Sequence, residues 1–127
     1  YLTVKRRERR SEMESIMIVD NEQYTHDFYH EMLESTEYEV INAYNGNEAL
    51  CRLKENSPVL IVIDHLVSQD MALTIIRAED GYSGYIENIP VIIASDFFQQ
   101  VVLVQTFLAN RANDTREIEF TGESRVP

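Results

Sequence analysis

The sequence is poor in cysteine, in basic residues and in long apolar runs, and each scarcity narrows what the chain can be. Its one cysteine, Cys51, cannot form an internal disulfide, so we expect a reducing, cytoplasmic setting. We expect Cys51 itself to be a small buried hydrophobic residue on a helix. No apolar run approaches the roughly 18 residues that a membrane-spanning helix needs. No signal-peptide pattern precedes the first apolar run, so we expect no membrane insertion.

Basic residues are half as numerous as acidic ones and are unevenly placed. The chain has 11 Lys and Arg against 22 Asp and Glu, a net charge of −11. Five of the basic residues lie in residues 1–10, within a stretch (1–14) that we expect to be a basic linker or an N-terminal helix. The remainder carries six basic and 21 acidic residues and repels phosphate, so we expect no nucleic-acid binding by this domain.

The length of 127 residues suits one domain, which we place at residues 15–121, followed by a tail at 122–127. Short apolar runs alternate with helical periodicity along it. The pattern predicts an α/β fold built on a parallel sheet, with helices on both faces. Strands are expected at residues 16–20, 38–44, 59–64, 91–95 and 116–120.

Helices are expected between these strands. The first carries apolar residues at spacings of about four from Tyr24, and the second starts at an N-cap on Asn45 or Asn47. Residues 70–80 look helical, and residues 81–88 look like a loop that contains glycine. Residues 97–110 form a long apolar helix candidate.

Acidic side chains follow two of the predicted strands at the point where each ends. Asp20 ends the first apolar run and Asp64 ends the third. If these strands are neighbours, the carboxylates converge at the edge of the sheet where such folds bind ligands. Converging carboxylates call for a cation, and Asp20, Asn21 or Glu22, and Asp64 suit Mg²⁺-assisted phosphoryl transfer onto a carboxylate. The alternative is that these acids only cap the helices that follow.

From about residue 16 to residue 120 the chain resembles a response-regulator receiver domain of two-component signalling. Three blocks carry the resemblance, in the family's order and spacing: "IMIVDNEQ", "YEVINAYNGNEALCRLKENSPVLIVIDHL" and "IPVIIAS". The resemblance implies a flavodoxin-like (βα)5 fold with a parallel five-stranded sheet of order 2-1-3-4-5. It also implies that a histidine kinase or phosphotransfer protein donates a phosphoryl group to Asp64, with Ser95 as the switch hydroxyl.

The resemblance further implies a Mg²⁺ site made by Asp20, Asn21, Asp64 and the backbone carbonyl of Leu66. Asn21 stands where the family has a second acid, so we expect weakened metal binding. Such a domain is not an enzyme beyond its own phosphorylation and dephosphorylation. A Mg²⁺-dependent phosphatase with an Asp nucleophile is a distant option, because it needs an acid two residues later and only Asp20, followed by Glu22, offers one.

The chain departs from the family on the signalling side of the site. The family's fifth strand ends in a lysine, whereas the only lysines here, Lys5 and Lys54, both precede Asp64. Arg116 is the candidate replacement, the switch aromatic is missing, and residues 121–127 are too short for the family's final helix. These losses support a second hypothesis, a degenerate pseudo-receiver that acts as a phosphorylation-independent protein-interaction module.

Two further features have a structural and a functional interpretation. His26 and His30 are four residues apart, as in a zinc-binding pair, but without a third ligand we expect satisfied or solvated histidines, His65 included. The helix at 97–108 is apolar on more than one face, which predicts contact with a protein partner or a dimer beyond core packing. Its apolar residues are Phe97, Phe98, Val101, Val102, Leu103, Val104, Phe107 and Leu108.

Overall fold

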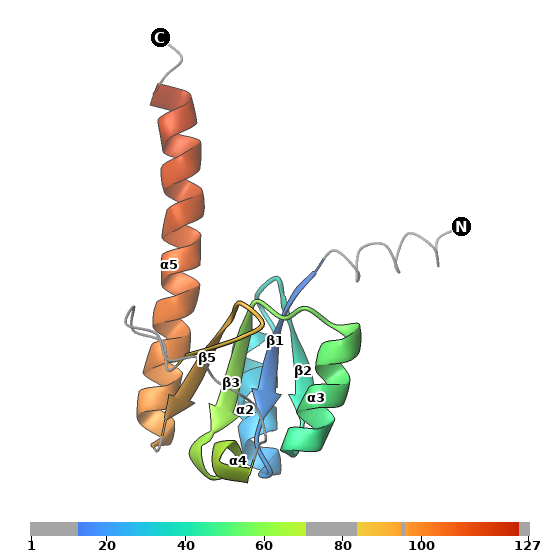
Figure 1. Ribbon diagram of the computed structural model, residues 1–127. Coiled ribbons are helices and arrows are strands. Elements are labelled where there is room, and N and C mark those ends of the chain that lie inside the picture. Colours follow the sequence, from blue (N-terminus) through green and yellow to red (C-terminus); the bar gives the residue numbers. More distant parts are fainter. Residues whose placement is uncertain (1–12, 71–83, 95, 125–127) are drawn as a thin grey trace, which may run out of the picture. The chain divides into compact units, whose positions relative to one another are not determined.

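The computed structural model describes residues 13–70, 84–94 and 96–124, with the backbone alone at residue 70 and at residues 114–124 (Figure 1). The chain divides into two compact units, one ending at Ser95 and one beginning at Asp96. The first unit is an α/β sheet domain, and the second is a single long helix. Each unit is described by itself below.

Four parallel strands form the body of the sheet, as the sequence predicts. They lie in the order β2 (Tyr38–Ala43), β1 (Glu14–Val19), β3 (Leu60–Asp64) and β5 (Ile89–Ala94). The arrowheads of β1, β2 and β3 point to one edge of the sheet (Figure 1). This arrangement is compatible with a flavodoxin-like fold.

The predicted fifth parallel strand is wrong. Residues 116–120 lie in helix α5 (Phe97–Ser124), because no glycine or proline interrupts the chain between Phe97 and Thr121. The fifth strand is instead β4 (Gly84–Ile86), which pairs antiparallel with β5, so the sheet order is β2-β1-β3-β5-β4 and the sheet is mixed.

The edge strand comes from a stretch that the sequence predicts as a loop. Ile86 pairs with Ile89 across a two-residue turn. Both turn residues, Glu87 at φ 50° and Asn88 at φ 70°, have the positive φ of a type I′ hairpin turn. Glutamate is an unusual residue for this conformation, which explains why the sequence does not predict the hairpin.

Three helices accompany the parallel strands: α2 (Gln23–Leu33), α3 (Gly46–Glu55) and α4 (His65–Asp70). Because β2 and β3 lie on opposite sides of β1, right-handed crossovers place α2 and α3 on opposite faces of the sheet. Alternate residues of each strand therefore enter different layers of the core, and Ile16, Met17, Ile18 and Val19 are all fully buried. The layer on the α3 side contains Met17, Val19, Ala43, Ala49, Ile61, Ile63, Val67, Ile86 and Val91.

Helix α3 starts at one of the two predicted caps. The side chain of Asn45 accepts a hydrogen bond from the backbone N–H of Glu48 at 2.9 Å, and Glu48 Oε2 accepts from Asn45 Nδ2 at 3.1 Å. Replacing Asn45 by alanine is expected to lower the free energy of unfolding by about 1 kcal/mol, because an N–H of the first turn loses its acceptor. Urea denaturation measures this change. Asn47→Ala, in the first turn of the same helix, is the matched control and is expected to have a smaller effect.

The expectation of a buried Cys51 is wrong, because its thiol is free and exposed on α3. Only Ala49 of this helix is fully buried, while Leu53 packs partly against the core. The helix thus contributes a narrow apolar stripe, and Cys51 lies outside it.

Helix α5 confirms the predicted helix at residues 97–110 and continues to Ser124. Asp96 caps it, since its Oδ1 accepts a hydrogen bond from Gln99 N–H at 3.0 Å. Among the helices in the described ranges, none is both long and apolar enough to cross a bilayer.

Candidate functional site

Asp20 and Asp64 lie at the same edge of the sheet, as the sequence predicts. Val19 and Ile63 are register partners on neighbouring parallel strands; Asp20 directly follows β1, and Asp64 is the last residue of β3. Such strands lie about 4.8 Å apart, so the two residues follow at adjacent positions. On the far side of β3, Asp64 is the register partner of Ala94. Ser95, the next residue and the predicted switch hydroxyl, lies outside the described residues.

Asp64 also serves as the cap of the helix that follows it. Its Oδ2 accepts a hydrogen bond from the backbone N–H of Leu66 at 3.1 Å, and α4 begins at His65. The side chain is half-buried, so the carboxylate remains open to a reactant from solvent. The capping alternative therefore holds for one oxygen of this carboxylate.

Asp20 is more deeply held, with only 5% of its surface exposed. Its Oδ1 accepts a hydrogen bond from Glu22 N–H at 2.8 Å, and its own N–H donates to the carbonyl of Ala43 on β2 at 3.1 Å. This Asx turn leads the chain from β1 into α2, where Glu22 occupies the N-cap position. Asp20 therefore has a local structural role as well as a place at the strand ends.

The donor set is chemically suited to Mg²⁺. Two carboxylates at neighbouring strand ends are hard oxygen donors, and the cap and the Asx turn each use one oxygen of a carboxylate. Asn21 is exposed beside Asp20. Leu66 lies in the first turn of α4, where carbonyls run along the helix axis toward residue i+4. No group of three His, Cys, Asp or Glu side chains able to hold a metal is present in the described part of the chain.

The sequence predicts that His26 is a histidine with satisfied hydrogen bonds, and the structure confirms this. It is fully buried on α2, with Nε2 2.8 Å from the carbonyl oxygen of Asp20 and Nδ1 2.7 Å from Asn42 Oδ1. The ring of Tyr44 lies against it, with the ring centroids 4.1 Å apart. Asn42 also contacts the exposed His30.

The sequence carries a signal for this cluster. His26 has the spacing of the inward-facing residues Tyr29 and Leu33, and Asn42 is a polar residue between Ile41 and Ala43 of the strand. A polar residue at an inward helix position, opposite a polar residue in a strand, predicts a buried hydrogen bond.

Tyr29 is fully buried on the same helix. Burial of the phenol, and secondly the negative charge of Asp20, raise the pKa of Tyr29 above its usual range. The Asp20 carboxylate thus lies within electrostatic reach of the Tyr29 hydroxyl.

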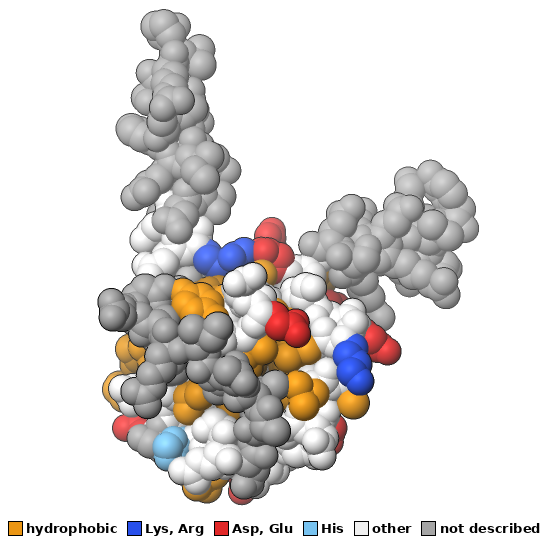
Figure 2. Space-filling view, viewed as in Figure 1, with side chains coloured by type: hydrophobic (Ala, Val, Ile, Leu, Met, Phe, Trp, Pro, Cys, Tyr) orange, Lys and Arg blue, Asp and Glu red, His pale blue; other side chains and the backbone are white. Residues whose placement is uncertain are grey.

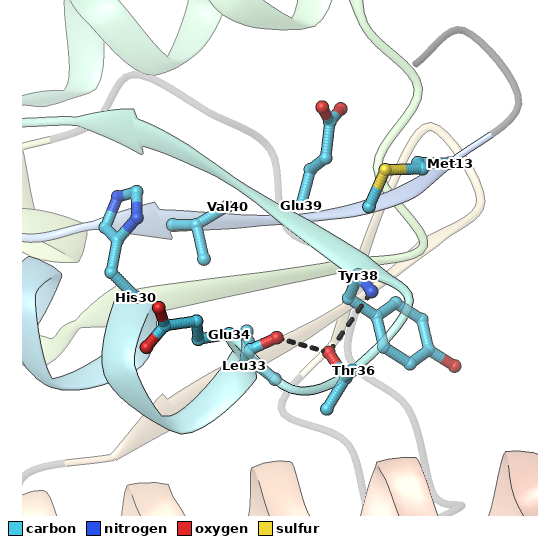
Figure 3. A pocket seen from close by; sticks show the side chains of 8 residues that line it. All are labelled: Met13, His30, Leu33, Glu34, Thr36, Tyr38, Glu39 and Val40. Carbon is cyan, nitrogen blue, oxygen red and sulfur yellow. Dashed lines mark hydrogen bonds between the residues drawn. The ribbon is translucent and has the colours of Figure 1, made fainter. Parts of the chain in front are cut away.

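The described residues also line a pocket of about 320 Å³ at the opposite ends of α2 and β2 from Asp20 (Figure 3). His30 and Leu33 come from α2, Glu34 is the C-cap of that helix, and Tyr38 comes from β2. The pocket contains none of the predicted site residues. Its full lining is Met13, His30, Leu33, Glu34, Thr36, Tyr38, Glu39 and Val40.

Comparison with known proteins adds no family assignment: no protein-family model matches the chain, and no curated protein matches it either.

Proposed function

We propose that the chain is a receiver-like signalling domain in which Asp64 accepts a phosphoryl group from a histidine kinase or phosphotransfer protein. One observation carries the proposal: Asp20 and Asp64 end neighbouring parallel strands at the same edge of an α/β sheet. Ligands of open α/β sheets bind outside the carboxyl ends of strands. The half-burial of Asp64 supports its role as the acceptor, since the group has to meet a donor.

The proposed reaction is a transfer between a nitrogen and an oxygen. The bond between phosphorus and the donor histidine nitrogen breaks as a bond forms between phosphorus and a carboxylate oxygen of Asp64. Mg²⁺ would neutralise charge on the phosphoryl oxygens, and Asp20, Asp64 and the Asn21 amide are its proposed ligands. The Leu66 carbonyl, directed along α4, is not among them. The Leu66 N–H keeps the Asp64 carboxylate oriented through the helix-capping bond.

The test is an amide NMR titration with Mg²⁺ and then with beryllium fluoride, which mimics an acyl phosphate. We expect beryllium fluoride to shift the amide signals of Asp20, Asp64 and their neighbours in the wild type. These shifts should be lost in Asp64→Asn, because the amide cannot form the beryllium fluoride adduct. Asp27→Asn is the matched control, since this exposed carboxylate bonds only to Gln23 within the described contacts and should leave the shifts intact. An unchanged wild-type spectrum, or shifts that persist in Asp64→Asn, would contradict phosphoryl acceptance.

A pseudo-receiver is the second candidate, and the antiparallel edge strand β4 favours it. The family's lysine ends a fifth parallel strand, whereas here β4 takes the edge and residue 116 lies in helix α5. Arg116 therefore has no strand to place it at the site. A folded wild-type protein that responds to neither Mg²⁺ nor beryllium fluoride would support this candidate, a phosphorylation-independent interaction module.

Helix α5 is the proposed partner surface under either candidate. Phe98 is 77% exposed and Val102 is 42% exposed, and large apolar side chains of this kind favour contact with another protein. On the face shown in Figure 2, hydrophobic and charged side chains of the sheet domain are interspersed.

A further inference from the structure

A chain of hydrogen bonds runs from the surface of the domain to the backbone of Asp20. His30, exposed on α2, lies 2.9 Å from Asn42 Nδ2 through its Nε2. Asn42 Oδ1 lies 2.7 Å from Nδ1 of the buried His26, whose Nε2 lies 2.8 Å from the carbonyl oxygen of Asp20. The chain therefore joins α2 and β2 to the residue that leaves β1.

The inner bond has only one polarity. A backbone carbonyl oxygen accepts hydrogen bonds and never donates, so Nε2 of His26 carries the proton in this contact. The Asn42 side chain fixes the ring plane from the other nitrogen, whichever way its amide is turned. The Tyr44 ring, inclined by 33° to the imidazole, restricts rotation from one side.

The bond matters because it completes the support of Asp20. The residue is tied to β2 by its N–H and to Glu22 by its Oδ1, and His26 adds the tie to α2 through its carbonyl. Those three bonds involve three different groups of Asp20. The Asx-turn bond closes a ring that includes the peptide following Asp20, and the His26 bond adds a direct hold on the carbonyl oxygen of that peptide.

We propose that His26 is a positioning residue for Asp20, and that its Nε2–H bond holds the β1–α2 connection in the orientation that binds Mg²⁺. The inference rests on the proposed function, because it concerns the same site. Residues that orient metal ligands without touching the metal commonly change metal affinity about 10- to 100-fold when they are replaced.

Two substitutions distinguish the contributions of the two ring nitrogens of His26. In His26→Gln the amide nitrogen replaces Nε2 and keeps a donor toward Asp20, whereas in His26→Asn the shorter amide replaces Nδ1 and reaches only Asn42. Both remove the buried ring, so both should lose stability in urea denaturation. We expect Mg²⁺ affinity, measured by amide NMR titration, to stay within about threefold of wild type in His26→Gln. In His26→Asn it should fall about tenfold or more.

His30→Ala is the matched control, because His30 is the exposed end of the chain and has no direct contact with Asp20 among the described contacts. It should leave Mg²⁺ affinity unchanged. Asn42→Ala supplies a second variant if His26→Asn does not fold, and we expect it to lower the affinity severalfold because the ring loses its orientation.

The outcomes distinguish this inference from the function on which it rests. Equal Mg²⁺ affinities in the two His26 variants would overturn the positioning role while leaving the proposed function standing. No Mg²⁺ binding by the wild type would overturn the metal site itself, and the positioning role with it. A selective loss in His26→Asn supports both.

Discussion

Replacing His26 by alanine is expected to lower the free energy of unfolding by about 3 kcal/mol, the largest effect that we anticipate from one polar substitution. The imidazole is fully buried and bonds through both ring nitrogens, to the Asp20 carbonyl and to the Asn42 side chain. Its removal leaves the Asp20 carbonyl without its ring donor and opens a cavity next to Tyr44. Urea denaturation followed by circular dichroism measures the change.

His30→Ala is the control for this prediction, since His30 contacts the same asparagine from an exposed position. Its expected effect is below about 1 kcal/mol, because water replaces an exposed hydrogen-bond partner. If the two alanine variants lost equal stability, the buried bonds of His26 would contribute nothing specific to the fold.

The second large effect is a loss of stability at alkaline pH that depends on Tyr29. Burial and the charge of Asp20 raise the pKa of Tyr29, so the folded state keeps its phenolic proton at pH values where the unfolded chain releases it. Stability from this group is therefore complete below pH about 10, the ordinary tyrosine value, and is lost as the pH rises toward the folded pKa. The slope approaches about 1.4 kcal/mol per pH unit.

Tyr29→Phe removes the ionisable group while keeping the ring. We expect the unfolding free energies of wild type and variant to differ by a constant amount up to pH about 9, and the variant to lose less stability above pH about 10. Urea denaturation at a series of pH values from about 8 to about 11 tests the prediction. Tyr24→Phe, at a position that is 62% exposed, should follow the wild-type curve. Parallel curves for wild type and Tyr29→Phe would show that the raised pKa of Tyr29 has no effect on stability.

The parallel part of the fold could be predicted because its signals are local. The run from Ile16 to Val19 is apolar at every position, as suits a strand covered on both faces, and the structure buries all four residues. The sequence left two candidates for the N-cap of α3, Asn45 and Asn47, and the structure shows that Asn45 is the cap. The positions of Asp20 and Asp64 at one edge follow from these strands once β1 and β3 are neighbours, a condition that the structure supplies.

The errors concern segments whose structure is decided by neighbours. Residues 116–120 alternate polar and apolar side chains as a strand does, but a helix satisfies its own backbone hydrogen bonds and continued through them. The three residues of β4 are too few to show a period, and they form a strand only because β5 offers its edge. Cys51 was assigned to the core by residue type, whereas its burial depends on the helix face.

At the site, sequence reasoning found the acids but not their support. The bond between His26 and the Asp20 carbonyl joins a helix to the end of a strand, and spacing along the chain does not reveal such a contact. The predicted role of Ser95 concerns a residue outside the described ranges and stays a prediction.

Strand β2 ends the sheet on one side, and no described strand pairs with its outer backbone groups. Bare edges of this kind are templates for growth of one sheet onto another, and proteins oppose such growth with charge. Between Ser11 and Cys51 the sequence contains ten acidic residues and no lysine or arginine, and Glu37 and Glu39 lie beside or within this strand. Two copies that approached edge to edge would therefore bring carboxylates together. The acidity of this half of the domain thus protects it from self-association into extended sheets.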